Sequence, residues 1–359
     1  MANFLVPMGH LMRDGNSGSH GAHEALVDTA KGAVVLERRT AVGHGPIGDI
    51  AVGAAGVVVT NFGADSVSIL DPAGLAHADV VHLAGEPNAV VVTEDRAYVA
   101  TASASHDDVS VIDLDTRTVV ATFPVAFGVT ALTAGPDGKR IYAGRTADDR
   151  VDITVIDVVA ERVGTIDIGY GPAACIDALR VDPDGKRLFA AVTDSVGSRL
   201  VVVDAETSRV QRVIGVGSPI RDIACAGGAV YVLTSDRAVG GAVHVVDLST
   251  GKVTDTVELG GAPTQLVMSP DQARAYIVDY DRVAVLCTLS LEVLDSLSVD
   301  ARPSCVASGV DGSQLYVADY SGAVNVFAVE STMEVLYSQF LATDPIAVGT
   351  PRFLQPATV

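Results

Sequence analysis

The sequence contains no tryptophan, and aromatic residues make up only 5% of its 359 positions. A core must therefore be built mostly from valine, alanine, isoleucine and leucine, and this β-branched bias favours strands over helices. Basic residues are also scarce, because 24 lysines and arginines stand against 44 acidic residues and leave a formal charge of -20. Such a surface repels polyanions, so we expect neither nucleic acid nor an anionic membrane as a partner.

Cysteines and long apolar runs are equally rare. The four cysteines form no Cys-x-x-Cys pair, so neither a disulfide framework nor a thiolate zinc site is indicated. The first residues lack the basic and apolar regions of a signal peptide. No apolar stretch reaches the roughly 18 residues that a membrane span needs. We therefore expect a cytoplasmic protein.

What the sequence does contain is a repeated unit of four short strands. One copy occupies residues 261–299, with strands expected at 262–268, 275–278, 283–286 and 291–297. Each unit begins at a corner, usually with proline, and the corners recur every 40 to 47 residues or about one propeller blade. They fall at residues 45–46, 86–87, 128–129, 171–172, 218–219, 262–263, 302–303 and 344–345.

The third strand of each unit gives the clearest count. It reads as a valine-rich run that in most copies ends in aspartate, and we expect this aspartate to cap the following turn. Seven copies lie at residues 67–71, 109–113, 153–157, 200–204, 243–247, 283–287 and 324–328, and an eighth lies at 24–28.

This count favours one all-β domain over residues 1–359, a β-propeller of eight four-stranded blades. Seven units would be complete, and residues 1–44 and 344–359 would together form a closing blade. Joining both termini in one blade would remove the open sheet edge that otherwise invites aggregation. The alternative is seven blades with an accessory N-terminal hairpin.

Short motifs carry a resemblance to a known family. The segments at 98–101, 136–143 and 315–318, together with the Val-x-Val-Ile-Asp strands, resemble the YVTN-repeat propellers. This family includes surface-layer-type proteins and is related to the lactonase-like and virginiamycin-lyase-like propellers. The resemblance implies a propeller but no particular reaction, since most members have no assigned catalysis. The missing export signal departs from the family pattern and weighs against a surface-layer role.

Histidines gather in one sector of the predicted propeller. A glycine- and serine-rich insertion at 8–23 carries His10, His20 and His23, and His44 lies in the corner that leads into the first complete blade. Because neutral imidazole is the commonest ligand of transition metals, these four residues form a candidate site for a divalent metal. The alternative is a solvated loop without a ligand. His106 lies in an equivalent loop two blades further on.

A second candidate site is the mouth of the central channel. Most first strands place small or apolar residues there, and the polar exceptions that we single out as ligand-binding are Asp49, Arg221, Asp222 and Gln265. A charge near the axis needs a partner or a ligand, so Arg221 could equally pair with an aspartate across the channel.

Two tyrosines at matching positions are further candidates for ligand binding. Tyr280 and Tyr320 follow their second strands in matching positions, where they would stack on a ligand or cover the blade ends. Phosphate-binding loops, dinucleotide-binding motifs and nucleophile elbows are missing from the sequence. The sequence thus predicts a small-ligand or metal-dependent site on the histidine-bearing face, with lyase, isomerase or hydrolase chemistry as the class if it is an enzyme. The alternative is a non-catalytic scaffold for a protein partner.

Overall fold

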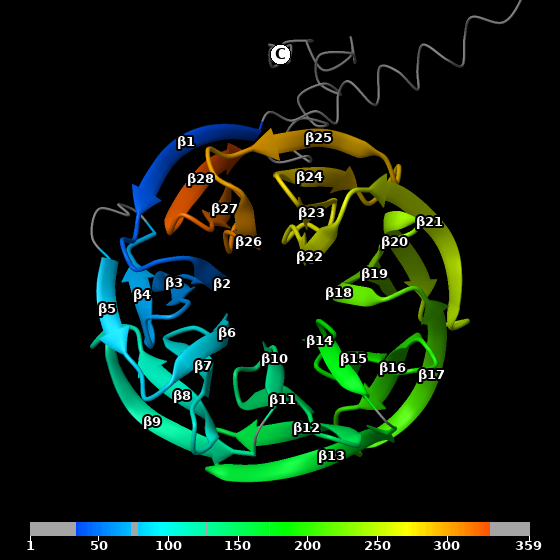
Figure 1. The fold of residues 1–359 in the computed structure, drawn as a ribbon, viewed down its shortest axis with the longest axis horizontal. Helices are drawn as coiled ribbons and strands as arrows, with labels where there is room; N and C mark the ends of the chain where they lie inside the picture. The colour runs from blue at the N-terminus through cyan, green and yellow to red at the C-terminus, as the bar shows by residue number, and fades with distance from the viewer. Residues whose placement is uncertain (1–33, 73–77, 127, 172, 331–359) are drawn as a thin grey trace, which may run out of the picture. The chain divides into compact units, whose positions relative to one another are not determined.

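The strands of the protein form a ring of blades in the computed structural model, which describes residues 34–72, 78–126, 128–171 and 173–330. The 28 strands in this part of the chain make seven four-stranded antiparallel sheets around one axis (Figure 1). In each sheet the first strand lies innermost and the fourth lies outermost. The predicted all-β propeller of four-stranded blades is therefore confirmed.

The first four blades follow one another along the chain. Blade 1 contains β2 (Ile47–Gly53), β3 (Gly56–Asn61), β4 (Ser66–Leu70) and β5 (Ala78–His82). Blade 2 contains β6 (Glu86–Val92), β7 (Arg96–Ala102), β8 (Asp107–Asp113) and β9 (Thr118–Val125). Blade 3 contains β10 (Val129–Ala134), β11 (Arg140–Thr146), β12 (Arg150–Asp157) and β13 (Arg162–Tyr170). Blade 4 contains β14 (Cys175–Val181), β15 (Arg187–Thr193), β16 (Ser198–Asp204) and β17 (Arg209–Gly217).

The last three blades close the ring. Blade 5 contains β18 (Ile220–Ala226), β19 (Ala229–Asp236), β20 (Gly240–Asp247) and β21 (Lys252–Gly260). Blade 6 contains β22 (Pro263–Met268), β23 (Arg274–Asp279), β24 (Arg282–Cys287) and β25 (Val293–Ser298). Blade 7 takes β26 (Pro303–Ser308), β27 (Gln314–Asp319) and β28 (Ala323–Val329) from the end of the described chain and β1 (Val34–Ala41) from its beginning.

Blade 7 corrects the expected number of blades. Residues 1–44 were expected to contribute to an eighth blade, but β1, the strand that the structure describes there, is the fourth strand of blade 7 and pairs with β28 from Val34↔Val329 to Ala41↔Ala323. In Figure 1 the blue β1 lies along the orange β28, so the ring closes at seven blades within the described residues. Residues 24–28 and 344–359, which were expected to supply the rest of an eighth blade, lie outside the described residues.

The turns between strands form for the reasons that the sequence indicates. In the turn at Pro136–Gly138, the amide of Gly138 donates to the carbonyl of Gly135 over 2.9 Å, and Gly138 has a φ of +65° that suits glycine. The aspartates that end most third strands cap the next turn as predicted. For example, the Asp204 Oδ1 accepts from the amide of Thr207 at 2.7 Å.

The core lies between neighbouring blades. Tyr98, Phe189, Tyr276 and Tyr316, all on second strands, are among the largest fully buried side chains. Valine, isoleucine and alanine fill the remaining space, as the composition requires. Across the described residues, no helix is long and apolar enough to cross a membrane.

Every first strand has a β-bulge near its start, which fixes where its side chains point. The pairing of first and second strands skips a residue in all seven blades, for example between Ile176 and Ala178 and between Ile220 and Asp222. A bulge re-aims the following side chains. We call the face with the second-to-third-strand turns and the corners between blades the upper face.

Candidate functional site

The acidic residues expected at the channel mouth join neighbouring blades. Asp49 accepts from the amide of Ile50 through Oδ1 and from the amide of Val90, in the next blade, through Oδ2, both at 2.9 Å. Gln265 repeats this link between blades 6 and 7, because its Oε1 accepts from the amide of Val306 at 2.7 Å. These contacts give Asp49 and Gln265 a structural role at the channel wall.

Asp222 makes the same kind of link and adds an ion pair. Its Oδ1 accepts from the amide of Ile223 at 2.8 Å, and its Oδ2 accepts from the amide of Leu266 at 3.0 Å. The Nη2 of Arg180 donates to the same Oδ1 at 2.8 Å. The basic partner of Asp222 is therefore Arg180, which the sequence analysis did not single out.

The charge of Arg221 acts on Asp177, where it opposes the desolvation that raises the pKa of this carboxyl group. Arg221 lies at the bulge of β18 and is exposed, whereas Arg180 lies on β14 beyond the bulge and reaches the channel. Arg180 lines two cavities, of about 400 and 290 Å³, that both include Val267 and Met268. The bulges were the missing signal, because they decide which polar residue of a first strand faces inward.

Burial in the channel wall shifts the acidity of both aspartates. Desolvation raises the pKa of Asp49 from 3.8 to about 6, although its amide partners and the charge of Arg180 oppose the shift. Desolvation also raises the pKa of Asp222, against the opposing charge of Arg180. A low-polarity environment disfavours the charged form of a carboxyl group, and this effect exceeds that of the hydrogen bonds here.

The candidate metal ligands are only partly described. His44 is exposed in the corner between β1 and β2, whereas His10, His20 and His23 lie outside the described residues. Within the described ranges, no group of three or more histidine, cysteine, aspartate or glutamate side chains could hold a metal ion. The metal site at the N-terminal histidines stays a prediction.

His106 lies in a hydrogen-bonded chain of side chains. Its Nδ1 is 2.7 Å from the Ser105 Oγ, and its Nε2 is 2.9 Å from the Asp108 Oδ2. The backbone amides of Ser105 and His106 both donate to the Ser103 Oγ, at 3.4 and 3.2 Å. Because both amides already donate to Ser103, neither is free to bind an oxyanion. We therefore assign no catalytic role to this group of hydrogen-bonded side chains around His106.

Tyr280 and Tyr320 enclose an arginine on the upper face. The guanidinium carbon of Arg302 is 4.3 Å from the ring centre of Tyr280 and 5.4 Å from that of Tyr320. The Arg302 Nε donates to the carbonyl of Tyr280 at 3.1 Å, and the amide of Tyr320 donates to the carbonyl of Arg302 at 3.0 Å. Tyr280 and Tyr320 are 57% and 51% exposed as whole residues, so this stack leaves much of their surface open to solvent.

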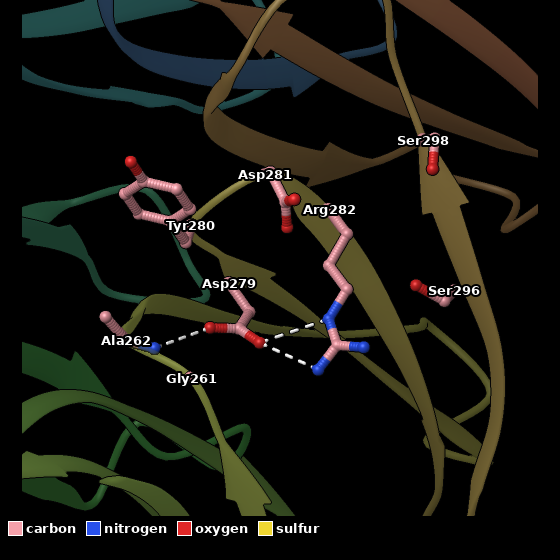
Figure 2. Close-up of a pocket in the computed structure, with 8 residues that line it drawn as sticks. All are labelled: Gly261, Ala262, Asp279, Tyr280, Asp281, Arg282, Ser296 and Ser298. Atoms are coloured by element: carbon pink, nitrogen blue, oxygen red, sulfur yellow. Dashed lines mark hydrogen bonds and ion pairs between the residues drawn. The ribbon is translucent and has the colours of Figure 1, made fainter.

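A pocket of about 420 Å³ opens beside this stack on blade 6 (Figure 2). Its lining comes from the corner before β22, the turn between β23 and β24, and the outer strand β25. The lining residues are Gly261, Ala262, Asp279, Tyr280, Asp281, Arg282, Ser296 and Ser298. Of these, only Tyr280 was among the residues selected from the sequence.

Asp279 organises the pocket. Its Oδ1 accepts from the amide of Ala262 at 2.7 Å, and its Oδ2 accepts from Nε and Nη2 of Arg282 at 3.1 and 3.0 Å (Figure 2). A Cβ on Gly261, whose φ is +58°, would lie 2.2 Å from the Asp279 Oδ1, so only glycine allows this approach. This pairing fixes the guanidinium of Arg282, so that its remaining nitrogen, Nη1, points toward the pocket.

Comparison with known proteins agrees with this fold. The chain is 36% identical over 344 residues to the seven-bladed beta-propeller protein Rv1057 of Mycobacterium tuberculosis, a match that covers 85% of this chain and 87% of the relative. It is 50% identical over 307 residues to a seven-bladed beta-propeller protein of Mycolicibacterium smegmatis, covering 85% of this chain and 83% of the relative. The chain belongs to this family of seven-bladed β-propeller proteins. The family name agrees with seven blades and not with eight.

Two solved structures show how widely this propeller fold occurs. A chain of Kuenenia stuttgartiensis hydrazine synthase matches with a TM-score of 0.69 and 21% identity, covering 81% of this chain and 97% of that chain. A chain of the mitotic checkpoint complex matches with a TM-score of 0.70 and 14% identity, covering 92% of this chain and 99% of that chain. At such identities the likeness concerns the fold alone. No family model matches the chain, so the resemblance to YVTN-repeat propellers stays a prediction.

Proposed function

We propose that this seven-bladed propeller binds a small polar molecule in the upper-face pocket of blade 6. The pocket volume of about 420 Å³ falls in the range of small-ligand sites. Polar side chains from three separate segments converge on it, as Figure 2 shows. The pocket lies on the same face as the corner that carries His44, the described member of the predicted histidine set. It includes Tyr280, which was selected from the sequence, and adds Arg282 as the main polar group.

The state of Arg282 is the observation that carries the proposal. Asp279, which is 3% exposed, holds Nε and Nη2, while Nη1 makes no hydrogen bond to the residues that the structure describes. In Figure 2 this nitrogen points toward the side of the pocket where Ser296 lies. A donor held in place by a buried carboxylate loses little conformational entropy on binding, which favours affinity for a ligand.

Binding without an assigned chemical step is the function that these residues support. The pocket lining contains no histidine and no cysteine, so it offers neither an imidazole base nor a thiol nucleophile. Lyase, isomerase or hydrolase chemistry remains tied to the predicted metal at the N-terminal histidines. The scaffold alternative predicts that no small molecule binds at this pocket.

Ligand-observed NMR with a library of water-soluble metabolites tests the proposal. We expect at least one metabolite to show saturation transfer from the wild-type protein, and the transfer should be lost in the Ser296→Ala/Ser298→Ala double variant. Both serines are exposed on the outer strand, so the double variant should fold normally. Binding that is equal in both proteins, or absent from both, would show that the pocket is not the ligand site.

A further inference from the structure

Three exposed aromatic residues occupy the same position in neighbouring blades. In each blade, one second-strand residue pairs with the first-strand residue just before the bulge, as Asp279 pairs with Pro263. The position in question is the next residue along the chain. From blade 1 to blade 7 it holds Phe62, Ala102, Thr146, Thr193, Ser235, Tyr280 and Tyr320. The aromatic residues thus fall in blades 6, 7 and 1, which are consecutive in the ring (Figure 1). Of the four exposed aromatic residues in the described part of the chain, three fall in this sector, and the fourth, Tyr170, lies at the end of β13 in blade 3.

Tyr280 holds its position at a local energetic cost. It is the first residue of a two-residue hairpin loop between Asp279 and Arg282, and its φ is +44°. A first loop residue with positive φ is typical of glycine in such hairpins, and a bulky residue there is strained. Strained residues cluster at ligand sites, where a fixed side-chain direction outweighs their cost. Eight non-glycine residues in the described part of the chain have positive φ, and Tyr280 is the one among them that lines this pocket, which supports a role for its ring in binding.

The charges around the pocket cancel. Asp279 and Asp281 carry two negative charges, and Arg282 and Arg302 carry two positive charges on the same turn and the neighbouring corner. Neither an anion nor a cation would gain net electrostatic attraction from this set. An uncharged ligand suits the pocket best.

The polar groups of the pocket that have no partner described above can donate to and accept from the hydroxyl groups of a ring-shaped ligand. The Nη1 of Arg282 supplies donors, the carboxylate of Asp281 supplies acceptors, and the hydroxyls of Ser296 and Ser298 supply both. Arg302 covers part of the Tyr280 ring, yet Tyr280 as a residue remains 57% exposed, and its ring can stack on one side of a ligand. The C–H groups on one face of a sugar ring carry partial positive charge and fit the negative face of an aromatic ring.

We infer that the pocket takes an uncharged sugar ring, stacked on Tyr280 and hydrogen-bonded through its hydroxyl groups to Arg282, Asp281 and the two serines. This inference rests on the proposed function and names its ligand class. A flat heteroaromatic ligand fits less well, because the wall formed by Ser296 and Ser298 offers hydroxyl groups where such a ligand needs a second apolar surface.

Titration with defined probes tests the ligand class. The probes are methyl α-glucopyranoside, methyl α-mannopyranoside and methyl α-galactopyranoside, with glucuronate as a charged sugar and adenosine as a neutral heteroaromatic compound. We expect saturable NMR shifts with at least one methyl glycoside and weaker binding of glucuronate and adenosine. Tyr280→Gly and Ser296→Ala should each weaken glycoside binding by about tenfold, as for the loss of one good contact.

Phe62→Ser provides the matched control, because Phe62 is an equally exposed aromatic residue at the same position of blade 1 but does not line the pocket. It should bind the glycoside as the wild type does. If neither Tyr280→Gly nor Ser296→Ala changes the affinity for the glycoside, the assignment of this pocket is overturned. Tighter binding of adenosine or glucuronate that depends on the same two residues would overturn the sugar class and leave the proposed function standing. No binding of any probe or library metabolite would reject both.

Discussion

The Nη2 of Arg180 lies 2.8 Å from the Oδ1 of Asp222, and this ion pair joins the first strands of blades 4 and 5 inside the channel. The charge of Arg180 also opposes the upward pKa shift that desolvation gives Asp49, which belongs to blade 1. One guanidinium on the channel wall therefore acts on carboxylates from two other blades. The channel is held together by polar contacts between first strands as well as by the apolar core between blades.

Removing this guanidinium should destabilise the ring. Arg180→Met leaves the buried carboxylate of Asp222 without its charged partner, although two backbone amides still donate to it. We expect a loss of about 2 kcal/mol in the free energy of unfolding, less than for a fully buried pair because Arg180 is 32% exposed. Urea unfolding followed by circular dichroism measures the loss. Arg221→Met, on the next first strand, is the control and should change stability by less than about 0.5 kcal/mol.

Asp49 should make the stability depend on pH in the acidic range. Its pKa is about 6 in the folded protein against an ordinary value of 3.8, so the folded state binds the proton more tightly than the unfolded state does. The stabilising contribution of the protonated carboxyl group is complete below about pH 4 and declines as the pH rises through 6, by about 3 kcal/mol in all. Comparing wild type with Asp49→Ala across this range isolates the effect.

A direct titration checks the same residue. Carbon-detected NMR of the Asp49 carboxyl group should give a midpoint near 6. Arg180→Met should move this midpoint upward, since the arginine charge opposes the shift. A midpoint near 4 in the wild type, or no change in the variant, would contradict the desolvated position of Asp49 at the channel wall.

Strand β1 should be essential to the ring. Deleting residues 1–42 removes the fourth strand of blade 7 and exposes the edge of β28, whose Val324 and Val326 are fully buried. We expect a loss of about 5 kcal/mol or of cooperative unfolding altogether, from the missing strand-to-strand hydrogen bonds and packing. Deleting residues 1–32 is the control and should keep cooperative unfolding because β1 remains. Equal stability of the two truncated proteins would contradict the closure by β1.

The two stacked tyrosines should respond differently to replacement by glycine. Tyr280→Gly relieves a positive φ of +44°, a gain of about 1 kcal/mol that roughly offsets the lost cation–π contact with Arg302. Tyr320→Gly loses the contact without such relief, so we expect a destabilisation of about 1 kcal/mol. Thermal unfolding of both variants tests the difference. Equal losses would show that Tyr280 is not strained in its turn.

The predicted metal site can be tested by metal content. Plasma mass spectrometry of tag-free protein should find about one equivalent of a transition metal if His10, His20, His23 and His44 bind it as the sequence predicts. The His20→Ala/His23→Ala variant should lose the metal while keeping its melting temperature in the metal-free form. No metal in the wild type after reconstitution with zinc, copper, iron or nickel would disprove the prediction.

Much of the fold could be read from the sequence because its signals are local. Proline corners, aspartates after third strands and the Pro136–Gly138 type of turn each act within a few residues, and the structure shows the strands where these signals place them. The candidate ligand residues were harder to predict. Asp49, Asp222 and Gln265 were selected as polar exceptions, and the structure gives each of them a partner in the next blade.

The sequence by itself determined that this protein is an all-β propeller of four-stranded blades, since alternating strands and turns at a regular spacing fit few other folds. Only the tertiary structure decided which strand closes the ring, because β1 could have paired with any open edge and the choice of β28 is a contact across the whole chain. The bulges also decided that Arg180, beyond the bulge of β14, lines the channel, whereas Arg221, at the bulge of β18, is exposed, since one extra residue in a strand re-aims the side chains that follow. The Tyr280–Arg302–Tyr320 stack likewise exists only because two turns and a corner meet on one face.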